Sequence, residues 1–228
     1  MLSEIAGRHE KARRFLTEKD FTAFVVSSAE NIQYLTGIQE PSIHTCGVAI
    51  ISRETPCKLA VMWLDENVAK NQTGIEVRTY TPYNQIDIVA DILNELGAIN
   101  GRIGMDSRAI TVLENSLRKK QRNIELVNAN NVIEELRWIK SNREIDLIQK
   151  ACEIADKGMK TAAEVLKPGI SELEAAALIE KEMISAGSDE LKHRTVVASG
   201  PRICLTHPFA THKKIAKGAC YNRFRCSL

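Results

Sequence analysis

The sequence has almost no net charge and no long run of apolar residues. Its 31 Lys and Arg residues are balanced by 29 Asp and Glu residues, which gives a formal net charge of +2. Proteins dedicated to binding nucleic acids usually carry a marked excess of basic residues, so a nucleic-acid partner is not expected. The longest apolar runs, such as the one from Cys46 to Ser52, are far shorter than the roughly 20 residues that span a bilayer. A membrane partner is not expected either.

Paired cysteine motifs and a secretory leader are also missing. The cysteines are scattered without C-x-x-C spacing, which predicts buried free thiols and neither a disulfide framework nor a zinc site. They are Cys46, Cys57, Cys152, Cys204, Cys220 and Cys226. The segment from Glu4 to Arg14 is charged, has a helical pattern, and lacks the apolar region of a signal peptide. We therefore expect a cytoplasmic protein.

What the sequence does contain is the composition of an ordinary folded protein. Hydrophobic residues make up 44% and charged residues 26% of its 228 residues, which suits one large domain or two modest ones. Up to about residue 130, short β-branched and aromatic segments alternate with amphipathic segments of helical spacing. Strands are expected at 21–27, 46–52, 58–63, 75–80, 102–105 and 124–127, and helices at 5–16, 31–37, 85–96 and 109–122. This alternation predicts an α/β domain with a mixed sheet.

Beyond Ala129 the pattern becomes almost entirely helical. A boundary is expected near Trp138, which gives one domain at 1–137 and a second at 138–228. The pattern Ser171-x-x-Glu174 is typical of a capping box that starts a helix. The elements expected in this part are helices at 132–139, 144–166 and 171–187, the last two packed as an antiparallel hairpin, then a strand at 194–199 and a turn at 200–201.

No residue before position 190 has the pattern of a catalytic group, because the charged residues there occupy positions expected on solvated helix faces. Asn31, Tyr34 and Gly37, in the segment Asn-Ile-Gln-Tyr-Leu-Thr-Gly, fit either a binding loop or a capped short helix. After position 190, His207 precedes a proline. Taken alone, such a histidine is more often a structural or surface residue.

Four segments carry a more specific signal. They are Asn31 to Gly37, Leu136 to Ala155, Leu166 to Glu172, and Val197 to Arg202 followed by His207. In this order they resemble the creatinase and Xaa-Pro dipeptidase family, a group of proline-specific metallopeptidases. The resemblance implies an α/β creatinase-type N-terminal domain with a mixed sheet, followed by the first part of a pita-bread α+β domain.

The resemblance also implies an activity and a site. Intact members of the family hydrolyse peptide bonds next to proline with two divalent cations (Mn, Co or Zn), and their N-terminal domains commonly contribute to a homodimer. His207 matches the family's active-site histidine, which positions the substrate or transfers a proton. An imidazole suits this role because it exchanges a proton near neutral pH and can polarise a carbonyl. His193 and His212 are interpreted as structural or surface residues.

The metal ligands of the family are not expected in this chain. A dinuclear hydrolase needs several carboxylates, and usually a histidine, around two cations. The resemblance places the first metal aspartate at Phe224, after Lys217-Gly218, and the other ligands beyond Leu228. No metal and no other cofactor is therefore expected here, and the chain is predicted to be inactive as a peptidase.

Residues 219–228 indicate a change of reading frame. When they are back-translated with permitted third bases and read in a shifted frame, they spell Leu-Val-Ile-Ile-Asp-Leu-Gly-Ala. Preceded by Gly-Asp, this is the sequence that the resemblance leads us to expect at this point. We hypothesise that a loss of two bases after Gly218 put the gene out of frame.

Two alternative functions stay open. One is a non-catalytic α/β dimerisation or binding module, built on the N-terminal domain. The other is a metal-free amidinohydrolase like creatinase, since that branch keeps the histidine and dispenses with the metals. The missing second half of the pita-bread domain counts against the amidinohydrolase.

Overall fold

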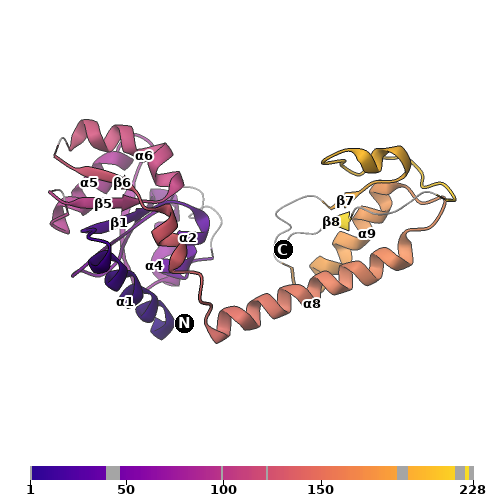
Figure 1. Ribbon diagram of the computed structural model, residues 1–228, viewed down its shortest axis with the longest axis horizontal. Coiled ribbons are helices and arrows are strands. Elements are labelled where there is room, and N and C mark those ends of the chain that lie inside the picture. Colours follow the sequence, from indigo (N-terminus) through magenta and orange to yellow (C-terminus); the bar gives the residue numbers. More distant parts are fainter. Residues whose placement is uncertain are drawn as a thin grey trace. The chain divides into compact units, whose positions relative to one another are not determined.

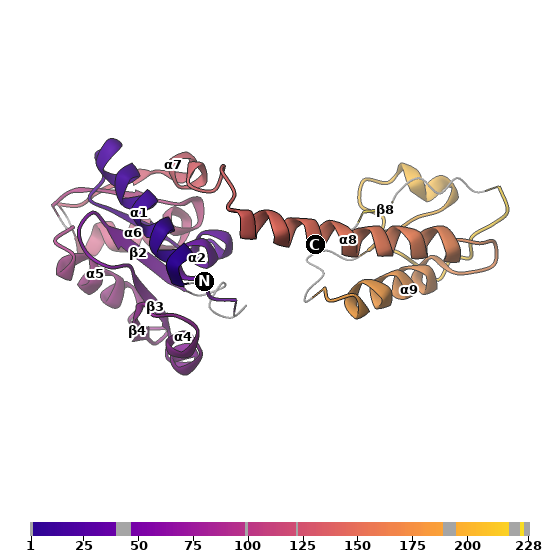
Figure 2. The ribbon, with the colours of Figure 1, turned by 90° about the horizontal axis from the view of Figure 1, so that it is seen from below.

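The chain divides into two compact units, Met1–Ile139 (unit 1) and Lys140–Leu228 (unit 2). The computed structural model describes residues 2–39, 47–98, 100–121, 123–188, 195–218 and 224–225, and Figures 1 and 2 show both units. Each unit encloses hydrophobic clusters of its own. Among the described helices, none is both long enough and apolar enough to cross a bilayer.

A mixed sheet forms the centre of unit 1. Its strands are β1 (Ala23–Val26), β2 (Val48–Ser52), β3 (Lys58–Met62), β4 (Glu76–Tyr80), β5 (Arg102–Met105) and β6 (Glu125–Asn128). The six strands lie in the order β4-β3-β2-β1-β5-β6. β2 is antiparallel to both of its neighbours, whereas all other pairs are parallel. The α/β fold with a mixed sheet that the sequence predicts is confirmed.

Helices cover both faces of this sheet (Figure 1). One face carries α1 (Leu2–Glu18), α2 (Ala29–Thr36), α4 (Glu66–Gln72) and α7 (Asn130–Glu135), and the other carries α5 (Gln85–Glu95) and α6 (Ser107–Lys120). Alternate residues of β1 point to the two sides: Phe24 and Val26 belong to the first core, and Ala23 and Val25 to the second. Because β1 is buried on both faces, it is apolar throughout and shows no polar alternation.

Two helices, α8 (Asn142–Val165) and α9 (Glu172–Ser185), form the body of unit 2 and lie side by side (Figure 2). Each begins with a complete capping box, formed by Ser141 with Glu144 and by Ser171 with Glu174. The helices approach closely at Gly158, where a Cβ atom would lie 2.7 Å from the sulfur of Met183. The predicted packing of these two helices, and the predicted cap at Ser171, are confirmed.

After α9, unit 2 continues with short elements. β7 (Val196–Val197) pairs antiparallel with β8 (Phe224–Arg225), and the 3-10 helix η2 (Gly200–Cys204) follows β7. The strand expected at 194–199 is therefore shorter in the part of the chain that the structure describes. The expected turn at Gly200 is the start of η2, where Pro201 fits because the first residues of a helix need no backbone donor.

The sequence does not predict one helix of unit 1, which is α4. α4, which follows a short 3-10 helix at Trp63–Asp65, lies between two segments predicted as strands. Only Ala69 of α4 is buried, so the segment offers almost no apolar periodicity by which to recognise a helix.

The expectation of buried thiols is only partly correct. Cys57 is buried, but Cys152 and Cys204 are exposed. Cys152 lies in α8, where most residues before Gly158 are exposed. Apolar residues that recur at helical spacing in this part of α8 are therefore not buried. Cys46, Cys220 and Cys226 lie outside the described residues.

Candidate functional site

His207 lies in the connection between η2 and a β-bridge that joins Lys214 to Ser171. Its imidazole is exposed and makes no hydrogen bond to any residue that the structure describes. The next residue, Pro208, is buried, which anchors the chain beside the histidine. Leu205 and Phe209, on either side, are exposed apolar residues. An exposed imidazole with apolar neighbours can contact a bound molecule and exchange a proton with it.

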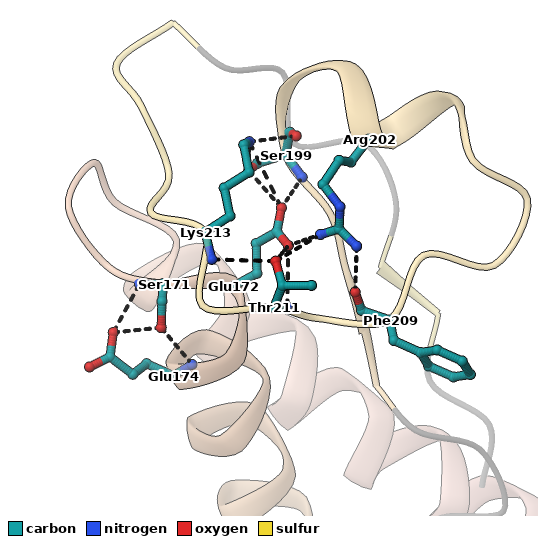
Figure 3. Close-up of polar contacts among 8 residues, drawn as sticks. All are labelled: Ser171, Glu172, Glu174, Ser199, Arg202, Phe209, Thr211 and Lys213. Carbon is teal, nitrogen blue, oxygen red and sulfur yellow. Dashed lines mark hydrogen bonds and ion pairs between the residues drawn. The ribbon is translucent and has the colours of Figure 1, made fainter.

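One buried carboxylate, that of Glu172, holds both ends of the loop at residues 200–210 (Figure 3). Its Oε1 accepts hydrogen bonds from the backbone N–H of Ser199, at 2.9 Å, and from the Ser199 hydroxyl, at 2.8 Å. Its Oε2 accepts from the Thr211 hydroxyl at 2.8 Å and from the Thr211 N–H at 3.3 Å. Since Ser199 and Thr211 flank the loop that carries His207, the two oxygens of one side chain bring the loop ends together.

Two cations complete this arrangement. Arg202 donates from Nη1 to Oε2 of Glu172, and from Nη2 to the carbonyl oxygen of Phe209 at 2.8 Å. The Nζ of Lys213 donates to the Ser199 hydroxyl at 2.7 Å and lies 3.9 Å from Oε1 of Glu172. We call this set the Glu172 cluster, and its members are Glu172, Ser199, Arg202, Thr211 and Lys213 (Figure 3).

The Glu172 side chain has 0% relative exposure, so its charge depends on its partners. Burial alone raises the pKa of a carboxyl group, because it disfavours the charged form. Here the hydrogen bonds from Ser199 and Thr211 and the charge of Arg202 outweigh burial, and the pKa of Glu172 lies below its ordinary value of 4.5. An unpaired buried carboxylate would cost several kcal/mol. The cluster therefore holds Glu172 as a carboxylate at neutral pH.

The sequence positions Glu172 through the start of α9. The capping box of Ser171 and Glu174 fixes the first turn of the helix, so Glu172 is its first residue. The N-terminus of a helix favours negative charge and leaves backbone N–H groups free to bind other partners. Two of them bind the segment after the loop: the N–H of Glu172 donates to Lys213 O at 3.0 Å, and that of Leu173 to Thr211 O at 2.9 Å.

The expectation that charged residues before position 190 lie on solvated helix faces is wrong for Glu172 and for Asp106, both of which have no exposed surface. The capping pattern predicts the helix start, but the residues that donate hydrogen bonds to the Glu172 carboxylate lie 27 to 39 positions along the chain. No local pattern connects residues at such a separation. The sequence therefore gives no signal that distinguishes Glu172 from an exposed glutamate.

The segment from Asn31 to Gly37 makes structural contacts. The amide of Asn31 donates to the buried carboxylate of Asp106 at 3.0 Å, and the Tyr34 hydroxyl donates to the carbonyl of Leu136 at 2.8 Å. Gly37 ends α2 in the left-handed conformation, with φ of 72°, which favours glycine. Of the two interpretations that the sequence leaves open, the structure shows the capped short helix.

The described residues do not fit a dinuclear metal centre. Over the ranges that the structure describes, no three side chains of His, Cys, Asp or Glu come together as a group that could hold an ion. Phe224, at the place where the resemblance expects the first metal aspartate, lies in β8 opposite Val197 of β7. His212 is exposed, and His193 lies outside the described residues.

Comparisons with known proteins find two family domains along the chain. Residues 8–139 match the Creatinase/Prolidase N-terminal domain, and residues 146–222 match Metallopeptidase family M24. The chain is 29% identical over 229 residues to the Xaa-Pro dipeptidase of Pyrococcus furiosus, and 24% identical over 225 residues to the creatinase of a Bacillus species. Its structure is similar to that of the prolidase from Pyrococcus horikoshii OT3, with a TM-score of 0.80 and 29% sequence identity.

These matches cover nearly all of this chain but only part of each relative. They include 97% of the chain and 63% of the Pyrococcus furiosus protein, and 94% of the chain and 54% of the creatinase. For the solved prolidase, the match covers 94% of this chain and 59% of that one. The chain thus spans between 54% and 63% of the length of these relatives.

Proposed function

We propose, because the chain belongs to the creatinase and prolidase family, that it is part of a metallopeptidase that hydrolyses peptide bonds next to proline. The matches to the Creatinase/Prolidase N-terminal domain and to Metallopeptidase family M24 support this class of enzyme. The similarity to an Xaa-Pro dipeptidase supports proline-containing peptides as substrates. The observation that carries the proposal is the exposed His207 on a loop held by Glu172.

We assign His207 the task of positioning the substrate or of passing a proton near the bond to be cleaved. Its exposed imidazole makes no hydrogen bond to any described residue, so both ring nitrogens can face a substrate. A histidine used in this way typically contributes about 10²- to 10⁴-fold to the rate. The loop supplies the fixed backbone that such a role requires.

The metal chemistry of this class is not assigned to the residues described. Two divalent cations (Mn, Co or Zn) would lower the pKa of a bound water and polarise the substrate carbonyl. The described part of the chain offers no group of three ligand side chains for them. We therefore infer that this polypeptide has no peptidase activity by itself, and that the activity belongs to a form of the protein with the full ligand set.

We also propose that residues 219–228 are translated out of frame. The shifted reading of this segment restores an aspartate in place of Phe224, within an apolar strand pattern. Sequencing the gene and the DNA that follows codon 228 tests this directly. The idea fails if the shifted frame does not continue into further carboxylate and histidine codons.

The activity is tested with four proteins: the chain itself, the product of the frame-restored gene, and the His207→Ala and His212→Ala variants of that product. Each is incubated with an Xaa-Pro dipeptide and Mn(II) or Co(II). We expect no cleavage by the chain, cleavage by the restored protein, and a loss of at least about 10²-fold in kcat/KM for His207→Ala. His212→Ala, which changes a nearby exposed histidine, serves as the control and should retain activity. A restored protein that binds metal but cleaves no Xaa-Pro bond would contradict the proposal.

A second candidate is a non-catalytic dimerisation or binding module. One observation favours it: unit 1 encloses two hydrophobic cores, one on each face of its sheet. Analytical ultracentrifugation of the whole chain without metal tests this candidate. A stable homodimer supports the module, whereas aggregation that grows with protein concentration contradicts it.

A further inference from the structure

We propose that Glu172 is a positioning residue for His207, because its carboxylate binds both ends of the loop at residues 200–210. The proposal rests on the function proposed above for His207. Glu172 touches no substrate in this scheme. It acts through the backbone of the loop, and its negative charge is the property that matters.

The Glu172 carboxylate closes the loop at its base. Ser199 binds Oε1 of Glu172 and Thr211 binds Oε2, so the two ends of the loop are held within the width of one carboxylate. Closing a loop of this size costs conformational entropy, which the contacts at its base must offset. A carboxylate accepts several strong hydrogen bonds at once, and bonds to an ionised acceptor are stronger than bonds between neutral groups.

Arg202 forms a brace across the loop. Arg202 binds Glu172 with one guanidinium nitrogen and the carbonyl oxygen of Phe209 with another, at 2.8 Å. His207 lies between Arg202 and Phe209 in the chain, so it belongs to the part that the brace encloses. The charge of Glu172 fixes the guanidinium, and the guanidinium fixes the backbone two residues beyond the histidine.

Backbone contacts hold the residues around the loop without the Glu172 side chain. The backbone N–H groups of Glu172 and Leu173 bind the carbonyls of Lys213 and Thr211, at 3.0 and 2.9 Å. These bonds survive a change of side chain at position 172. Removal of the charge should therefore release the loop while α9 and the segment after Thr211 stay in place.

The test is the variant Glu172→Gln in the whole chain. Glutamine keeps one acceptor oxygen. Its NH₂ group replaces the other oxygen, so a donor now faces either the donors of Ser199 or those of Thr211 and Arg202. We expect backbone amides at 200–210 to exchange hydrogen at least about ten-fold faster, with exchange in α8 unchanged. The matched control is Glu174→Gln, two residues away. Glu174 is exposed and binds the backbone N–H and hydroxyl of Ser171 but none of the cluster residues on the other side of the loop.

A second measurement separates positioning from general stability. The imidazole NMR signals of His207 should shift or broaden in Glu172→Gln and stay in place in Glu174→Gln. His9, in unit 1, provides the internal reference. If the His207 signals and the exchange at 200–210 are unchanged in a folded Glu172→Gln protein, or change equally in Glu174→Gln, the proposal is wrong.

A third variant decides the case in which Glu172→Gln fails to fold. Thr211→Val removes the hydroxyl that binds Oε2 at 2.8 Å and keeps the shape of the side chain. It should accelerate exchange at 200–210 by a smaller factor, in the same direction, and unchanged exchange would overturn the proposal. These measurements need neither metal nor peptide, so their failure is distinguishable from a failure of the peptidase assay.

Discussion

The hydroxyl of Tyr34 donates a hydrogen bond of 2.8 Å to the backbone carbonyl of Leu136, across 102 positions of the chain. The same carbonyl accepts a second bond, of 2.6 Å, from Nζ of Lys11. The guanidinium of Arg8 lies 4.6 Å from the centre of the Tyr34 ring. Through these contacts, Tyr34 joins α1 and α2 to the segment that ends unit 1.

Tyr34→Phe should lower the free energy of unfolding of unit 1 by about 1 kcal/mol, because a buried hydrogen bond is lost while Lys11 still satisfies the carbonyl. Urea unfolding followed by circular dichroism measures the change. Tyr83→Phe is the matched control, since Tyr83 is 97% exposed. An equal loss for both variants would show that the bond to Leu136 contributes nothing.

A larger loss is expected from Asp106→Ala. This buried carboxylate caps α6 through the N–H of Ala109 at 2.8 Å, and accepts bonds from Ser28 N at 2.9 Å and Asn31 Nδ2 at 3.0 Å. Its removal leaves several buried donors without a partner, so we expect a loss of about 3 kcal/mol or more in the free energy of unfolding. Asp91→Ala, at an exposed position of α5, should change stability by less than about 0.5 kcal/mol. A loss below 1 kcal/mol for Asp106→Ala would contradict this account.

The sequence predicts the fold of unit 1 well because its strands and most of its helices have clear periodicity. β1 and its neighbours are apolar on both faces, and α6 carries its buried residues Ala109, Leu113 and Leu117 at four-residue spacing. α4 lacks such a pattern and is missed. Periodicity also marks α8 as a helix, but it does not reveal that Ile145 and Ile148 are half exposed.

The site is less predictable than the fold. His207 is predicted as a site residue because the chain resembles a family, and the structure adds its exposure and the loop that carries it. Glu172 is missed because its burial depends on residues far along the chain, which no local pattern identifies. Long-range polar contacts of this kind become visible only in three dimensions.

The lowered pKa of Glu172 predicts a dependence of stability on pH. The folded state binds the proton more weakly than the unfolded state, in which the pKa is near the ordinary 4.5. The stabilisation from Glu172 is therefore complete above that value and is lost as the pH falls through the lowered folded pKa. Unfolding of the chain at a series of pH values from neutral to about 3 measures this, with Glu172→Gln as the comparison.

The wild-type protein should lose more stability than Glu172→Gln as the pH falls below 4.5. Glu174→Gln provides the second comparison, because the pKa of Glu174 is also lowered, by its bonds to the N–H and hydroxyl of Ser171. If wild type and Glu172→Gln show the same pH dependence, the charge of Glu172 does not stabilise the folded state.

The exposure of the thiols predicts a difference in their reactivity. Cys57 is 1% exposed, and burial raises the pKa of its thiol to about 12. Only the thiolate is nucleophilic, so at pH 8 Cys57 is both inaccessible and almost entirely protonated. Cys152 and Cys204 are exposed. Native protein treated with iodoacetamide should therefore carry the label on Cys152 and Cys204 and not on Cys57, as measured by mass spectrometry of peptides.

The control is the same reaction in concentrated urea, where all three thiols should react at similar rates because unfolding removes both burial and the raised pKa of Cys57. A native Cys57 that reacts as fast as Cys152 would mean that the strand region around it opens on the timescale of labelling. Since Cys57 belongs to the core on the α1 face of the sheet, such opening would require unit 1 to unfold locally. Protection of Cys57 thus measures the integrity of unit 1, independently of any activity.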